Sequence, residues 1–321
     1  MEWIKKGVLL RTEDLQADWI ASHVQMPTPY YINQDIIRIY FSARDKECIS
    51  HPIYIDIDRH NYSIVSKHTK PLLDLGRIGT FDDSGIIFSS CVEFKDKLYM
   101  YYIGWNKEHI LPYTLSIGLA ISEDGGNTFY KASEGPVMDR DIECPYFNTA
   151  PYVIKEEDRL RMWYVYCTEW QHNEQDGYVP AYLIRSAVSE DGMHWRREKT
   201  EINGGGVNCI EYKNIHEAIG RPWVIKRNSG YYMWYSYRDT KDFRRNKSNA
   251  YRIGLAVSQN GTDWIRKDEN VGIEKSQTGW DSEMMCYSSV IENNDDIVMF
   301  YNGNEHGRYS FGYAVCPKKE L

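Results

Sequence analysis

The chain has 321 residues, of which 42% are hydrophobic and 26% charged, so it can bury a large core and is too apolar for a disordered protein. Its formal net charge of −8 argues against a nucleic-acid partner, because such a partner requires a basic face. Aromatic residues make up 14% of the chain, which favours β-strands and sugar-binding surfaces over a helical bundle.

The first residues are unlike a signal peptide, because their apolar run is only Val8-Leu9-Leu10 and acidic residues follow at once. No apolar segment approaches the length needed to span a membrane. The seven cysteines are odd in number and lack a Cys-x-x-Cys spacing, which predicts reduced thiols rather than disulfides or a zinc site. We therefore expect a cytoplasmic protein without membrane insertion and without a cofactor.

One strand pattern recurs five times, at intervals of about 65 residues. Its copies are residues 38–45, 99–106, 161–170, 232–239 and 298–305. An apolar strand precedes each copy, and a third strand follows the last four copies. In three copies an Asp-Gly or Asn-Gly turn then leads to a fourth strand. This repeat predicts an all-β, five-bladed β-propeller with four antiparallel strands per blade, forming a single domain over residues 1–321.

The fifth repeat has no fourth strand of its own, because the sequence ends shortly after its third strand, residues 310–316. Residues 3–10, WIKKGVLL, resemble the fourth strand of the fourth repeat, which starts WIRKDENVGI at residue 264. We therefore predict that residues 3–10 complete the last blade and close the ring.

In a four-stranded blade, the first strand starts and the second strand ends at the same rim of the central channel. Side chains at these positions should therefore converge on one pocket. From the starts of the first strands we expect His23, Gln25, Asp82, Asp83, Glu143, His216, Glu217, Arg221, Asp281 and Glu283. From the ends of the second strands we expect Arg44, Asp45, Trp105, Glu169, Trp170, Arg238, Asp239, Asn302 and His306.

Acids recur at this rim in four of the five blades. The stretches TFDDSGIIFSSCV (80–92) and GWDSEMMCYSSVI (279–291) both carry Asp-Ser ahead of a core strand, which aligns Asp83 with Asp281. Such acids can also be solvated or paired with the nearby arginines. His23, His216 and His306 lack a metal-ligand spacing, so we expect no zinc site, while a divalent ion held by the acids stays open.

With five repeats of this length, acids at the inner strand starts and Ser-x-Asp-Gly-x-x-Trp turns, the chain resembles the five-bladed β-propeller glycosidases. These include the invertase, levansucrase, arabinanase and xylosidase families and the β-mannoside phosphorylases. IECPYF (142–147) is similar to the Glu-Cys-Pro motif of the invertase group. The resemblance implies that Glu143 is the general acid and that Asp83 stabilises the transition state.

The chain departs from these families in blade one. There the families carry an aspartate that acts as nucleophile or base, whereas SHVQMPTPYY (22–31) contains no acid. Either another acid takes this role, with Asp281, Glu283 and Glu217 as candidates, or the chemistry differs. The first hypothesis is therefore a glycoside hydrolase-like enzyme, in which two carboxyl groups act on opposite sides of the scissile bond.

Two alternatives remain open. A phosphorylase or glycosyltransferase of surface-polysaccharide metabolism would act on a phosphorylated or nucleotide-linked sugar, which Arg44, Arg221 and Arg238 could hold. A propeller without catalytic activity would only bind a glycan, with Trp105 and Trp170 stacking on the sugar. All three hypotheses share a carbohydrate or sugar-phosphate ligand.

Overall fold

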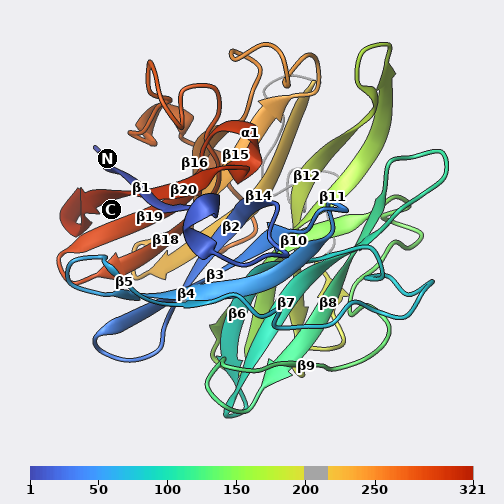
Figure 1. Cartoon of the computed structure of the whole chain (residues 1–321), viewed down its shortest axis with the longest axis horizontal. Helices are drawn as coiled ribbons and strands as arrows, with labels where there is room; N and C mark the ends of the chain where they lie inside the picture. Colours follow the sequence, from blue (N-terminus) through green and yellow to red (C-terminus); the bar gives the residue numbers. More distant parts are fainter. Residues whose placement is uncertain (199–215, 321) are drawn as a thin grey trace.

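A computed structural model describes residues 1–198 and 216–320 of the chain. In these two segments the strands form five four-stranded antiparallel sheets, which are arranged around a common centre (Figure 1). The chain is therefore a five-bladed β-propeller with very little helix, which confirms the fold predicted from the repeat.

The first four blades follow the order of the chain. Blade one consists of β2 (Ser22–Tyr31), β3 (Ile36–Arg44), β4 (Ser50–Asp58) and β5 (Ile64–His68). Blade two consists of β6 (Ile86–Phe94), β7 (Lys97–Asn106), β8 (Thr114–Ser122) and β9 (Tyr130–Lys131). Blade three consists of β10 (Asn148–Glu156), β11 (Arg159–Asn173), β12 (Gly177–Ser189) and β13 (Arg196–Arg197). Blade four consists of β14 (Glu217–Arg227), β15 (Gly230–Asp239), β16 (Arg252–Ser258) and β17 (Ile265–Arg266).

Blade five joins the two ends of the described chain. It consists of β18 (Cys286–Asn293), β19 (Asp296–Asn302), β20 (Ser310–Pro317) and β1 (Ile4–Arg11). β1 pairs antiparallel with β20, with Ile4 opposite Val315 and Arg11 opposite Ser310, and the two termini lie close together (Figure 1). The predicted closure of the ring by the N-terminal strand is confirmed. The short helical segments are η1 (Thr12–Leu15), η2 (Asp268–Asn270), α1 (Asn304–Gly307) and η3 (Lys318–Glu320).

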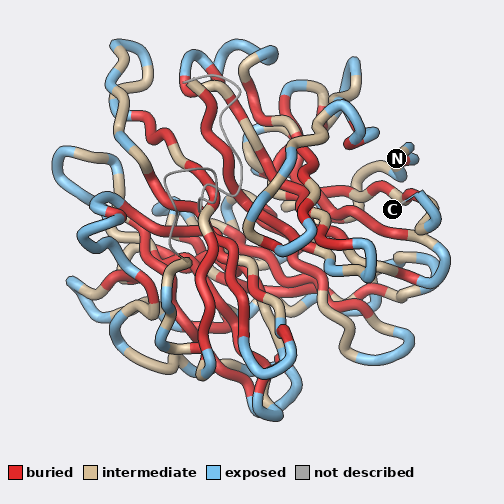
Figure 2. The backbone as a smooth tube through the Cα atoms, turned by 180° about the vertical axis from the view of Figure 1, so that it is seen from behind, coloured by how far each residue is buried: buried red, intermediate tan, exposed pale blue. Residues whose placement is uncertain are grey.

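The Ser-x-Asp-Gly turns hold neighbouring blades together. In blade three, Ser189 Oγ accepts a hydrogen bond from Gly192 N at 2.8 Å, and the carbonyl of Gly192 accepts one from Tyr101 Oη of blade two at 2.9 Å. Gly192 has a φ of +80°, and a Cβ there would lie 2.8 Å from the ring of Tyr99, so only glycine fits. These turns, which connect the third and fourth strands, therefore have a structural role. The buried strands nearer the centre form the core (Figure 2).

The β11–β12 hairpin is longer than the hairpins of the other blades and projects beyond the ring (Figure 1). Near its tip, the carboxylate of Asp176 lies 3.7 Å from Arg244 and 3.0 Å from Arg245, both in the loop between β15 and β16. Two ion pairs thus link blades three and four above the rim.

Two other expectations concern the whole chain. None of the helices in residues 1–198 and 216–320 is both long and apolar enough to cross a membrane. The six cysteines in the same residues are free thiols, whereas Cys209 lies outside the described part.

Candidate functional site

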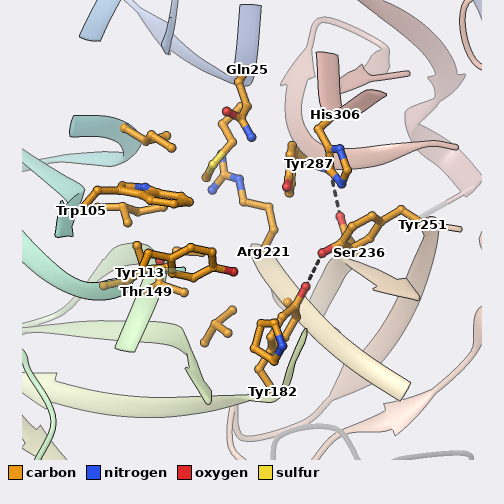
Figure 3. Close-up of a pocket in the computed structure, with 18 of the residues that line it drawn as sticks. Gln25, Trp105, Tyr113, Thr149, Tyr182, Arg221, Ser236, Tyr251, Tyr287 and His306 are labelled. Carbon is orange, nitrogen blue, oxygen red and sulfur yellow. Dashed lines mark hydrogen bonds between the residues drawn. The ribbon is translucent and has the colours of Figure 1, made fainter. Parts of the chain in front are cut away.

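A central pocket with a volume of about 330 Å³ opens at the rim where the first strands start and the second strands end. All five blades contribute to its wall, which is lined among others by His23, Gln25, Arg44, Trp105, Tyr113, Phe147, Thr149, Tyr182, Arg221, Ser236, Arg238, Phe243, Arg244, Tyr251, Tyr287 and His306. Figure 3 shows Arg221 between an aromatic wall at Trp105 and Tyr113 and a second wall at Tyr251 and Tyr287. The pocket therefore lies at the rim that the topology predicted.

The structure brings only some of the predicted site residues together. Those that line the pocket are His23, Gln25, Arg44, Trp105, Arg221, Arg238 and His306. Those that do not line it are Asp45, Asp82, Asp83, Glu143, Glu169, Trp170, His216, Glu217, Asp239, Asp281, Glu283 and Asn302. Among the described residues the lining contains no aspartate or glutamate, so the expected convergence of the acids on one pocket is not observed.

The buried acid of blade five faces the outermost strand instead of the pocket. Asp281 is 1% exposed, and its carboxylate lies 2.6 Å from Lys5 Nζ on β1. Tyr301 of β19 donates a hydrogen bond to the same carboxylate at 3.0 Å. The acid thus fastens the loop before the first strand to the second and fourth strands of its own blade.

Blade two repeats this arrangement with Asp82. The Asp82 carboxylate accepts a hydrogen bond from Tyr102 Oη at 2.9 Å and lies 2.6 Å from Lys131 Nζ on β9. Asp82 is therefore the structural equivalent of Asp281, which corrects the alignment of Asp83 with Asp281 by one residue. Asp83 turns the other way, where it accepts hydrogen bonds from Gly79 N, Ser84 Oγ and Asn106 Nδ2, and these bonds lower its pKa despite partial burial.

Blades three and four contain a similar contact, in which a fourth-strand arginine and a second-strand tyrosine meet an acid or each other. In blade four, Arg266 of β17 forms ion pairs with Glu217 at 2.8 Å and with Asp268 at 2.7 Å, and Tyr235 donates to Asp268. In blade three, the basic, tyrosine and acidic partners are Arg197, Tyr164 and Asp141.

Blade one lacks the tyrosine and the acid that form this contact in the other blades. Its second strand carries Phe41 where the other blades carry a tyrosine, and the nearest acid before its first strand, Asp18, is exposed. Phe41 has no hydroxyl group to donate to a carboxylate, which fits the lack of a buried acid at the start of blade one.

The other acids and polar residues of the prediction lie around the rim. Glu143 and Glu283 are exposed, and Glu283 forms an ion pair with Lys247. The remaining residues form hydrogen bonds within nearby turns and strand ends. The side chains of Asp45 and Asp239 accept from backbone N–H groups two to four residues later, and Glu169 accepts from Gln171 Nε2. The carbonyl of His216 accepts from Thr240 N, and Asn302 Nδ2 donates to Val24 O.

Two arginines of the lining are buried and a third, Arg44, is partly buried, and none of the three has a carboxylate partner in the described residues. Arg221 is 2% exposed, and its two Nη atoms donate to Ser89 O and Thr28 Oγ1, each at 3.0 Å. Arg238 is also 2% exposed and donates to two backbone carbonyls and to Tyr251 Oη. Arg44 donates to Gln25 Oε1 at 3.2 Å. Burial lowers the pKa of Arg221 to about 10, so this guanidinium is still charged at neutral pH.

Several hydrogen-bond donors of the wall have no partner within the described protein. These buried atoms are Arg44 Nε, Arg221 Nε, Trp105 Nε1 and Thr149 Oγ1. The first three can only donate hydrogen bonds, and they come from three different blades. Because buried polar groups are nearly always satisfied in folded proteins, this wall is suited to a ligand that is rich in acceptor oxygens.

The two pocket histidines are neutral at physiological pH. Burial, together with the charges of Arg244, Arg238 and Arg44, lowers the pKa of His306 from 6.5 to about 3. Burial and the charge of Arg44 lower the pKa of His23 to about 3 in the same way. A neutral imidazole ring can accept a proton, so each ring is a potential proton acceptor in the pocket.

Sequence reasoning missed the aromatic residues of the wall. Tyr113 and Tyr251 lie just before the starts of third strands, and Tyr182 lies within the third strand of blade three. The prediction did not consider third strands, although they also reach the pocket rim. Tyr287 lies at the start of β18 and could have been found by the rule used for the acids. Trp170, which was predicted, lies behind the wall and packs on Tyr113 with a ring-centroid distance of 5.3 Å.

No family model matches the chain. Two Mycobacterium tuberculosis proteins, "Uncharacterized protein Rv1502" of strain ATCC 25618 / H37Rv and "Uncharacterized protein MT1551" of strain CDC 1551 / Oshkosh, are each 33% identical to it over 317 residues. The alignments cover 98% of this chain and 99% of each relative. The chain belongs to the family of these two proteins.

Solved structures with the same fold include glycoside hydrolases. A complex of BT0996 with RGII superposes with a TM-score of 0.75 at 15% identity and covers 98% of this protein and 92% of BT0996. "Crystal structure of a thermostable family-43 glycoside hydrolase" gives 0.67 at 16% identity, covering 94% and 92%. A structure from the GH130 family of mannoside phosphorylases gives 0.61 at 16% identity, covering 94% and 86%. The expected likeness to the glycosidase propellers is thus confirmed for the fold.

Proposed function

We propose that this member of the Rv1502 family is a carbohydrate-active enzyme whose central pocket binds a sugar through an anionic group, either a carboxylate or a phosphate. The observation that carries the proposal is the set of buried arginines that have no carboxylate partner in the described residues. The shared fold with glycoside hydrolases supports a carbohydrate as the ligand.

The arginines favour an anion for an electrostatic reason. Removing a charged group from water costs several kcal/mol even after the protein relaxes, and an opposite charge offsets this cost. Arg44, Arg221 and Arg238 line the same cavity, so an anion bound there would offset part of their positive charge. Arginine also binds carboxylates and phosphates with charge-assisted hydrogen bonds, which are roughly twice as strong as neutral ones.

The remaining wall favours a sugar as the carrier of the anion. Trp105 and Tyr113 form an aromatic pair with a ring-centroid distance of 4.5 Å, and both line the pocket. Aromatic faces pack on the apolar faces of sugar rings, while the free donors Trp105 Nε1 and Thr149 Oγ1 suit sugar hydroxyl groups. A volume of about 330 Å³ is at the small end for ligand pockets, which suits one or two sugar units.

A glycoside hydrolase with two carboxyl groups is the less supported alternative. Such an enzyme needs carboxyl groups about 5–9.5 Å apart across the scissile bond. In the described residues, Asp281 and Glu217 are held in buried ion pairs with fourth-strand cations, and Glu143 and Glu283 are exposed at the rim. A phosphorylase or glycosyltransferase stays compatible with the arginines, since its substrate or co-substrate would carry phosphate.

Thermal denaturation with small ligands tests the proposal. We expect glucuronate, inorganic phosphate or a sugar phosphate to raise the melting temperature, and glucose to have little effect. At a concentration one hundred times the Kd, a ligand adds about 2.7 kcal/mol to the free energy of unfolding. The three anions distinguish a carboxylate site from a phosphate site.

A pair of arginine variants locates the binding. Arg44→Gln should weaken anion binding by at least about tenfold, since a hydrogen bond to a charged group contributes about 1.5–3 kcal/mol. Arg77→Gln, at an exposed arginine that pairs with Glu134, is the matched control and should bind normally. If none of the anions binds, or if both variants bind as the unmodified protein does, the proposal is wrong.

A further inference from the structure

We propose that the pocket cleaves a glycan by β-elimination at a uronate unit, with Tyr251 and His306 transferring the protons and the pocket arginines holding the uronate carboxylate. This inference rests on the proposed function and specifies its substrate class and its reaction.

The proton-transferring residues lie together on one wall. The rings of Tyr251 and His306 pack edge to face with a centroid distance of 5.5 Å, and both line the cavity (Figure 3). Arg238 Nε donates to Tyr251 Oη at 3.2 Å, and the Tyr182 and Tyr251 hydroxyl groups share a hydrogen bond. A phenol, an imidazole and a guanidinium group therefore lie together on this wall of the pocket.

The composition of the wall fits elimination better than hydrolysis. Hydrolysis of a glycosidic bond uses carboxyl groups to protonate the leaving oxygen and to activate water or attack the sugar. Elimination from a uronate needs cations on the substrate carboxylate, one proton acceptor and one proton donor, and it uses no water. The described lining provides arginines, histidines and tyrosines and contains no carboxylate.

The reaction is balanced by the substrate and the two side chains alone. Arg44 and Arg221 would bind the carboxylate and stabilise the charge that moves into it as the adjacent C5–H bond breaks. A ring nitrogen of His306 accepts the C5 proton, and the C–H electron pair forms a double bond between C4 and C5. The C4–O4 bond breaks with its electron pair on O4, and Tyr251 Oη donates its proton to that oxygen. The proton on His306 then returns to Tyr251 through solvent.

The carboxylate of the bound substrate also affects the base, His306, through its charge. His306 is kept neutral by burial and by the charges of Arg244, Arg238 and Arg44, which together lower its pKa to about 3. A bound carboxylate offsets the positive charge of these arginines, which raises the pKa of the imidazole and strengthens it as a base. A neutral sugar would leave the base weak, so the carboxylate selects the substrate and also activates the pocket.

Digalacturonate linked through O4 is the probe, with the corresponding neutral galactose disaccharide as its control. Elimination gives an unsaturated uronate, whose conjugated double bond absorbs in the ultraviolet at wavelengths where the substrate does not, and two products whose masses sum to that of the substrate. In heavy-oxygen water neither product should gain the isotope. Hydrolysis would give no new absorbance and would place one heavy oxygen atom in a product, and this result would overturn the inference.

Three variants assign the roles. Tyr251→Phe and His306→Asn should each lower kcat by about 10²–10⁴-fold, the usual contribution of a general acid or base, with binding of digalacturonate retained. Asparagine suits position 306 because His306 has a φ of +60°, a conformation that asparagine tolerates. Glu143→Gln, the exposed rim acid, is the control and should keep full activity. Loss of activity in Glu143→Gln with full activity in the other two would overturn the assignment.

The binding and cleavage assays separate this inference from the proposed function. If digalacturonate and glucuronate bind but neither digalacturonate nor a glucuronate disaccharide linked through O4 gives unsaturated product, elimination is wrong and anion binding stands. If neither the uronates nor phosphate binds, both proposals are wrong. Should Tyr251→Phe fail to fold, the result for His306→Asn decides the assignment.

Discussion

Buried charges at the outer side of each blade differ from buried charges at the pocket. At the outer side each has a partner: Asp281 meets Lys5 at 2.6 Å, and Asp82 meets Lys131 at 2.6 Å. At the pocket, Arg221 and Arg44 have no carboxylate partner in the described residues, and each has a buried Nε atom without an acceptor. The paired charges stabilise the blades, whereas the cations at the pocket are the basis of the proposed ligand site.

Removing the partner strand should have the largest effect. Deletion of residues 1–11 removes β1, so β20 loses its neighbour and Asp281 is left buried without Lys5. We expect the truncated chain to lose cooperative unfolding in a thermal scan. A synthetic peptide of residues 1–11 should restore the transition when added in excess. A truncated chain with an unchanged melting temperature would show that closure contributes little.

Two acids of one loop should differ strongly in their effect on stability. Asp281→Asn removes one member of a buried ion pair, which costs about 3–5 kcal/mol of the free energy of unfolding. Glu283→Gln, two residues later, removes an exposed ion pair with Lys247 and should cost less than about 1 kcal/mol. Chemical denaturation measures both. An equal loss of stability in both variants would mean that the ion pair between Asp281 and Lys5 does not stabilise blade five.

The pocket histidine should make stability depend on pH. The pKa of His306 is about 3 in the folded protein, well below its ordinary value of 6.5, so the unfolded chain binds the extra proton as the pH falls below 6.5. Stability then falls by about 1.4 kcal/mol per pH unit from this residue alone. Between pH 6.5 and about 4.5, His306→Asn should therefore lose about 2 kcal/mol less than the unmodified protein. Parallel curves for both proteins would contradict the depressed pKa.

Two arginines of the same strand provide the finest test. Arg38 and Arg44 both lie on β3, but Arg38 forms an ion pair with Asp56 at 2.7 Å and Arg44 has no such partner. Arg44→Met should change the free energy of unfolding by less than about 1 kcal/mol, or raise it, since it removes a partly buried charge that has no carboxylate partner in the described residues. Arg38→Met should cost about 3–5 kcal/mol. A large loss in Arg44→Met, measured without ligand, would mean that its charge is already compensated.

The sequence was sufficient to predict the blades and the closing strand. Alternating apolar and aromatic residues with a fixed interval define the strands, and the similarity of residues 3–10 to the fourth strand of blade four predicted β1. The rim that carries the pocket followed from the strand order alone. These features depend on local pattern and connectivity, which a repeat makes visible.

The direction of the rim acids could not be predicted in the same way. Asp82 and Asp83 are neighbours, yet one faces the fourth strand and the other faces a surface turn, because adjacent loop residues point to different sides. One sequence signal was available: the blade whose first strand, residues 22–31, contains no acid is also the blade with Phe41 in place of a tyrosine. Tyr113, Tyr182 and Tyr251 were missed because third strands were not considered, whereas Tyr287 lies at a first-strand start.

The pairing of β1 with β20 also has a consequence for synthesis on the ribosome. β1 emerges first, but its partner emerges only after about 300 further residues, on the order of 15–60 s later at about 5–20 residues per second. Throughout this interval β1 is an unpaired strand that could join another nascent chain. Lys5 and Lys6 lie within it, and lysine on an unpaired strand opposes such association. Lys5 thus opposes association of the unpaired strand with another chain, and in the folded protein the same residue forms the ion pair with Asp281.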